Sequence, residues 1–164
     1  ARADVIAACG MPVLISDYFQ YYRLAAYLSG YTKEPIAITM GASSMKDLFD
    51  EQYYTGLEGG VLESFGRLFK NDLKIFCYPM EDGETGELIN GDNLKFSPQL
   101  QLLYDYLISR GEIISLDNHD PQCLKLFSRD VLSRIKRGDS SWESMVPDAV
   151  ADVIKAKAYF GHQS

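Results

Sequence analysis

The first half of the chain alternates between short apolar runs and stretches whose apolar side chains recur at helical spacing. Three runs have the length and content of buried strands, at residues 13–15, 35–40 and 73–78. Helical spacing is found at residues 19–28, 45–49 and 61–69. Because apolar strands that alternate with helices belong to parallel sheets, the pattern predicts an α/β domain with right-handed crossovers.

The second half of the chain is expected to be mainly helical. Helical patterns cover residues 100–109, 121–137 and 147–157, and a short strand is expected at 112–116. Residues 81–92 are acidic and rich in glycine and contain the turn dipeptides Asp-Gly and Asn-Gly, so we expect a surface loop or a hairpin there.

Length and charge limit the classes of protein to consider. At 164 residues the chain fits a single domain over residues 1–164. A net charge of −7 argues against general nucleic-acid binding, which requires a basic face, although residues 125–137 hold five cations and one acid. No apolar run approaches the roughly 20 residues that span a bilayer, so we expect no membrane partner.

The cysteines indicate the cellular compartment, and the first residues indicate whether the chain belongs to a longer protein. Cys9, Cys77 and Cys123 have no Cys-x-x-Cys spacing, which is typical of reduced thiols and favours a cytoplasmic protein. Because the chain starts at Ala1 without an initiator Met, we expect it to be the C-terminal part of a longer protein, with other domains as partners.

Candidate binding residues follow the ends of the expected strands, where ligands of parallel sheets usually bind. Gly41 and Ser43 come after the second strand, and Tyr18, Gln20, Tyr21 come after the first, with Arg23 close behind. The aromatic rings are of the kind that stacks on a base or a nicotinamide-like ring. Alternatively, the tyrosines belong to a helix at the sheet edge, with buried rings and solvated hydroxyls. The residues alone favour neither interpretation.

A second candidate site lies where Ser128 stands beside several cations. If a helix begins there, Ser128 and the free N–H groups would bind a phosphate, which the helix dipole also favours. Arg129, Arg134 and Lys125 would neutralise its charge. The alternative is one continuous helix over residues 121–137 with its cations in solvent. The residues alone favour the continuous helix.

Metal binding is not expected. Asp117, His119, Asp120 and Cys123 lie close together, but their spacing matches no zinc or calcium pattern. Asp120 and the following proline are better explained as the start of a helix. With only His119 and His162 available, no Ser/His/Asp or Cys/His catalytic set is evident, and we expect no catalytic residues of that kind.

Two segments resemble the bacterial nicotinate-nucleotide adenylyltransferases. The first runs from Arg-Ile-Lys-Arg-Gly at 134–138 to Val-Pro-Asp-Ala-Val at 146–150 and Val-Ile at 153–154. The second is Ile-Thr-Met-Gly-Ala-Ser-Ser-Met at 38–45, which is similar to the family's Ile-Gly-Ala-Asp strand end, with residues 73–79 matching its next strand. The resemblance implies a three-layer parallel sheet of the Rossmann-like nucleotidyltransferase type, with a mainly helical C-terminal portion.

The catalytic motifs of that family are degenerate in this chain. Of its Ser-Ser-Thr-x-Ile-Arg turn only Ser128 is retained, and Leu132 stands where the family has arginine. Its His-x-Gly-His turn has no counterpart, since residues 18–21 read Tyr-Phe-Gln-Tyr, and Ser43 replaces its aspartate.

The expected function is therefore nucleotide or small-molecule binding, or interaction, without efficient catalysis. One alternative is an active adenylyltransferase that uses ATP, magnesium and a nicotinate or nicotinamide mononucleotide. Another is a protein-interaction module that has no nucleotide ligand.

Overall fold

The chain forms two compact units in a computed structural model that describes residues 1–83 and 85–162. One unit is made of Ala1–Asp17 with Leu126–Ser164, and the other of Tyr18–Lys125. We call them the helical unit and the sheet unit and describe each by itself.

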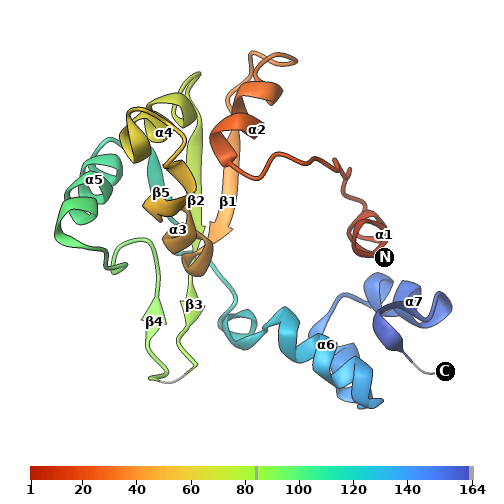
Figure 1. Cartoon of the computed structure of the whole chain (residues 1–164). Coiled ribbons are helices and arrows are strands. Elements are labelled where there is room, and N and C mark those ends of the chain that lie inside the picture. Colours follow the sequence, from red (N-terminus) through yellow and green to blue (C-terminus); the bar gives the residue numbers. More distant parts are fainter. Residues whose placement is uncertain (84, 163–164) are drawn as a thin grey trace. The chain divides into compact units, whose positions relative to one another are not determined.

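The sheet unit contains a parallel sheet of three strands, β1 (Ala37–Gly41), β2 (Lys74–Tyr78) and β5 (Ile113–Ser115), in the order β1-β2-β5 (Figure 1). The expected mixed α/β class and parallel pairing are confirmed. Its other elements are α2 (Tyr21–Leu28), α3 (Ala42–Leu48), η1 (Glu51–Tyr54), α4 (Gly60–Leu68), β3 (Met80–Glu81), β4 (Leu88–Ile89), α5 (Pro98–Ser109) and η2 (Pro121–Lys125). Strands β3 and β4 pair as an antiparallel hairpin, one of the two structures expected for residues 81–92.

One face of the three-stranded sheet forms the core of this unit. Ile75, Cys77 and Ile113 are fully buried among side chains of α3, α4 and α5. On the opposite face Thr39 is exposed and Phe76 is only half-buried. The strands therefore alternate between a buried and a partly solvated face, as half-covered strands do.

The strand expected at residues 13–15 is absent, and that prediction is wrong. Residues 11–19 form no helix or strand, and Leu14 and Ile15 are 61% and 82% exposed. An apolar run becomes a strand only when a neighbouring strand satisfies its backbone groups, and here no described strand pairs with it.

The helical unit packs α1 (Arg2–Ala8), α6 (Ser128–Arg137), η3 (Ser140–Met145), α7 (Asp148–Ala156) and η4 (Tyr159–Gly161) around a small core. Ile135, Trp142, Ala151 and Ile154 are buried there. Gly138 ends α6 in the left-handed conformation at φ +70°, which glycine adopts without strain.

The continuous helix favoured for residues 121–137 is also wrong. The 3-10 helix η2 stops at Lys125, and α6 begins afresh at Ser128 after Phe127, whose backbone is extended. Asp120 accepts a hydrogen bond from the backbone N–H of Gln122 at 2.9 Å, which confirms it as the residue that starts η2.

The three cysteines should differ sharply in reactivity. Cys77 is fully buried, and burial raises the pKa of its thiol to about 11, whereas Cys9 and Cys123 are exposed. We expect iodoacetamide at pH 8 to modify two thiols of the folded protein, and the third only in denaturant. Peptide mass spectrometry identifies the sites, and rapid modification of Cys77 in buffer would contradict its burial.

Candidate functional site

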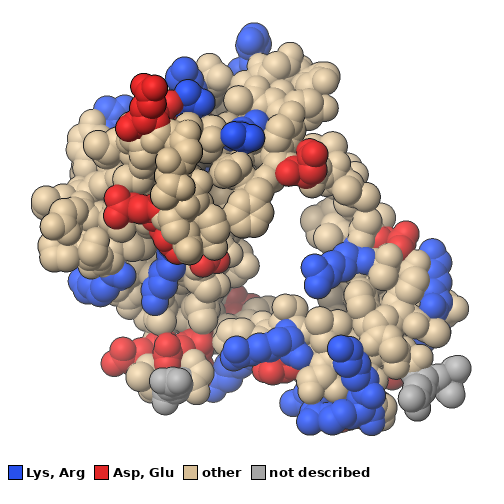
Figure 2. Space-filling model, viewed as in Figure 1, with Lys and Arg blue, Asp and Glu red and all other residues tan. Residues whose placement is uncertain are grey.

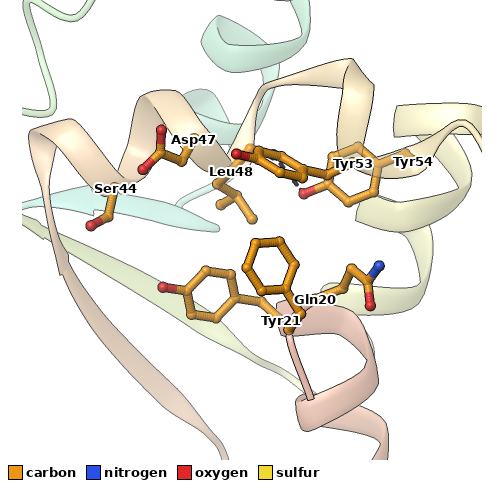
Figure 3. A pocket seen from close by; sticks show the side chains of 8 residues that line it. Gln20, Tyr21, Ser44, Asp47, Leu48, Tyr53 and Tyr54 are labelled. Carbon is orange, nitrogen blue, oxygen red and sulfur yellow. Dashed lines mark hydrogen bonds between the residues drawn. The ribbon is translucent and has the colours of Figure 1, made fainter. Parts of the chain in front are cut away.

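A cavity of about 200 Å³ lies in the sheet unit between the start of α2, the helix α3 and the 3-10 helix η1. In Figure 3, Tyr53 and Tyr54 lie on one side of it, Gln20 and Tyr21 on the opposite side, and Ser44 and Asp47 together toward one end. The cavity is lined by Phe19, Gln20, Tyr21, Ser44, Asp47, Leu48, Tyr53 and Tyr54.

Local structure places each group of lining side chains. Ser44, Asp47 and Leu48 are three and four positions apart in α3, so they share one face of that helix. The Asp50 carboxylate accepts the backbone N–H of Gln52 at 3.0 Å and starts η1 (Glu51–Tyr54), which carries both Tyr53 and Tyr54.

The aromatic residues of the cavity differ in how deeply they are buried. Tyr54 is buried, donates its hydroxyl to the Leu48 carbonyl at 2.7 Å, and has its pKa raised by burial. Phe19 is 72% exposed and packs against Tyr53, with ring centroids 5.4 Å apart at 56°. Tyr54 thus forms a buried part of the cavity wall. Phe19 and Tyr53 form its exposed edge, which we call the aromatic rim.

The cavity combines aromatic rings with polar side chains. Its rings offer stacking surfaces, while Gln20, Ser44 and Asp47 offer hydrogen-bond donors and acceptors. Neither histidine lines it, and no group of three or more His, Cys, Asp or Glu within residues 1–83 and 85–162 is arranged to hold a metal ion.

The predicted site residues of the sheet unit fall into three places. Gln20 and Tyr21 line the cavity, whereas Tyr18 and Arg23 line a separate groove beside α2. Ser43 is exposed in the first turn of α3. Gly41 is buried at the end of β1, where an added Cβ would come within 2.9 Å of the Tyr78 ring. Gly41 therefore makes room for Tyr78.

The predicted phosphate site in the helical unit is divided between the two ends of α6. Ser128 is its exposed first residue, and Arg129 beside it stacks over the Phe127 ring at 5.2 Å. Arg134 lies in the last turn, where it donates to the Ser141 hydroxyl at 2.5 Å and faces Asp139 at 3.8 Å. Ser128 also borders a groove of about 530 Å³ whose lining is mainly apolar.

Several lining residues of the cavity were not anticipated from the sequence. Ser44 lines the cavity and Ser43 does not. Which of the two serines faces the cavity depends on how α3 is turned about its own axis, and the sequence does not show this. The expectation that ligands bind at the ends of parallel strands indicates residues 40–43. It does not indicate Asp47, Tyr53 and Tyr54, because their segment contains no strand end. A usable signal was the density of aromatic residues in 49–54.

None of the helices in the part of the chain that the structure describes has the length and apolar character needed to cross a bilayer. A comparison of the chain with protein-family models, with curated proteins and with solved structures finds no match.

Proposed function

We propose that this chain is a small-molecule-binding domain whose cavity takes one planar, hydrogen-bonding ring, such as a nucleobase or a nicotinamide-like ring. The observation that carries the proposal is the cavity itself, which is lined by both aromatic and polar side chains. Its volume of about 200 Å³ is below the roughly 300–1,000 Å³ of pockets for drug-sized ligands, so it suits one ring system.

The proposal includes descent from the nucleotidyltransferase type without efficient adenylyl transfer. Adenylyl transfer requires preorganised donors that stabilise developing charge, and loss of one such donor costs roughly 3–4 kcal/mol. Where the resembled family has imidazoles, this chain places Gln20 and Tyr21 at the cavity. Arg134 is already engaged by Asp139 and Ser141, so the proposal does not use it as a phosphate-binding residue.

The three-layer arrangement and the compartment proposed for the domain rest on the resemblance and on the thiols, respectively. The Rossmann-like arrangement implied by the resemblance has helices on both faces of the sheet, so it requires a second layer of helices over the half-exposed face. Three free cysteines, two of them exposed, fit the reducing conditions of a cytoplasm.

Alanine at the aromatic rim should weaken ring binding. Phe19→Ala and Tyr53→Ala each remove a stacking surface worth about 1–3 kcal/mol, or roughly 5- to 150-fold in Kd. The measurement is calorimetric titration of adenosine and nicotinamide, which are uncharged and so report on binding without any contribution from a phosphate. Tyr106→Ala, which removes a ring that is 56% exposed on α5, is the matched control and should bind as the parent does.

Two outcomes would overturn the proposal in different ways. Absence of affinity for every ring compound, together with a concentration-dependent mass, would identify an interaction module. Release of pyrophosphate from ATP and nicotinate mononucleotide with magnesium, abolished by Ser128→Ala or Arg129→Gln, would identify an active adenylyltransferase.

A further inference from the structure

A second hollow of the sheet unit lies between α2 and α4, and we call it the basic groove. It is separate from the cavity proposed above to take a ring, which we call the ring cavity. The basic groove encloses about 770 Å³. In Figure 2, Lys and Arg side chains are visible over the end of this unit that carries α2 and α4. The groove is lined by Tyr18, Tyr22, Arg23, Ala26, Tyr27, Arg67 and Lys70.

The groove concentrates positive charge in an acidic protein. It has three cations, Arg23, Arg67 and Lys70, in a chain whose net charge is −7. Arg67 forms a salt bridge with Glu63 one turn away on α4, whereas Arg23 and Lys70 form none within residues 1–83 and 85–162. Two cations without a carboxylate partner are therefore available to a ligand, and the third cation of the groove has its own counterion.

A buried tyrosine holds the two guanidinium groups in place. The Tyr22 ring is 6% exposed, and the guanidinium carbons of Arg23 and Arg67 lie 5.9 and 5.8 Å from its centroid. Arg23 also donates from Nε to the Tyr22 hydroxyl at 3.2 Å, and this hydrogen bond raises the pKa of Arg23. Cation–π contact and hydrogen bonding reduce the side-chain entropy that anion binding would otherwise cost.

Tyrosine rings form the rest of the wall. Tyr18 and Tyr27 pack with centroids 5.4 Å apart, and each is more than a third exposed. Their rings add apolar surface to the groove that the cations line, and charge-assisted hydrogen bonds are stronger beside apolar surface than in open water.

We propose that the basic groove binds the phosphate or pyrophosphate group of a small molecule, as a site distinct from the ring cavity. Guanidinium groups match the oxygens of phosphate bidentately, and an ammonium adds a point charge. The net charge of −7 repels a long polyanion but leaves a compact anion attracted by the local cations.

Pyrophosphate titration at low ionic strength tests this proposal. We expect saturable binding that weakens at least about tenfold in the Arg23→Gln, Lys70→Gln double variant, because two charge-assisted contacts are lost. Lys95→Gln, which removes one exposed cation outside the groove, is the control and should leave the affinity unchanged. Arg23→Lys should weaken binding by an intermediate amount, since the bidentate fork is lost while the charge stays.

Pyrophosphate as the probe tests phosphate binding in the basic groove independently of ring binding in the ring cavity. Pyrophosphate carries no ring and adenosine carries no phosphate, so Phe19→Ala should leave pyrophosphate binding intact. Absence of saturable binding, or an equal loss in Lys95→Gln, would overturn the proposal. Tighter binding of single-stranded oligothymidylate than of pyrophosphate would show that the groove serves a nucleic acid instead.

Discussion

Replacement of Phe49 by alanine should lower the free energy of unfolding of the sheet unit by about 3–5 kcal/mol, the usual cost of removing a buried phenyl ring. Phe49 is 1% exposed. Its ring centroid is 4.6 Å from those of Phe65 and Phe96 and 5.3 Å from that of Tyr104. The ring thus joins α4, α5 and the segment before α5, and its loss leaves a cavity that three neighbours cannot fill.

Urea denaturation followed by far-ultraviolet circular dichroism measures this effect. Because small domains have only about 5–15 kcal/mol of stability, the variant should begin to unfold at much lower urea concentrations than the parent. Phe49→Leu keeps most of the volume and should cost clearly less, while Tyr106→Ala at the surface should stay within about 0.5 kcal/mol. A loss below about 1 kcal/mol for Phe49→Ala would mean that the aromatic cluster is not the centre of the core.

The helical unit should be most sensitive at Ile135. This side chain is 1% exposed and packs with Trp142, Ala151 and Ile154 in a small core. Ile135→Ala should lower the free energy of unfolding of the helical unit by about 2–5 kcal/mol, because a core this small has few side chains that can move into the cavity left by the substitution.

Trp142 supplies a reporter for this second prediction, since it is the single tryptophan of the chain and is buried. Its fluorescence during urea unfolding therefore reports on the helical unit alone. Ile135→Val should cost about 0.5–1.5 kcal/mol, and Lys136→Ala on the exposed side of α6 should change little. An unchanged fluorescence transition in Ile135→Ala would contradict the packing described for this unit.

Hydrophobic periodicity predicted most of the elements. The strands that become β1 and β2, and the helices that become α2, α4, α5 and α7, all lie where apolar spacing placed them, within a few residues. Periodicity succeeds there because each element buries one face against the core of its own unit.

Periodicity failed where a structure depends on its neighbours. Residues 13–15 have strand-like content, yet no strand is present to pair with them. Apolar spacing is continuous across residues 121–137, but the extended backbone of Phe127 divides them into two helices.

The candidate site was predicted only in part, because its residues converge through tertiary packing. Gln20 and Tyr21 are placed by the local start of α2, which a sequence pattern can indicate. Tyr53 reaches the same cavity from a 3-10 helix more than thirty positions along the chain. Arg67 of α4 and Lys70, which follows that helix, line the same groove as Arg23 because α2 packs against α4, and this packing leaves no pattern within either segment.

The contact between Tyr22 and Tyr54 has a thermodynamic consequence. Tyr22 lines the basic groove and Tyr54 lines the ring cavity, and their centroids are 6.5 Å apart. Both residues are nearly inaccessible, at 6% and 4% exposed, so each ring is closely packed by its neighbours. If both hollows bind the ligands proposed for them, a ligand that displaced one of these rings would disturb the other, and linkage would then require that each ligand alter the affinity of the other by the same factor.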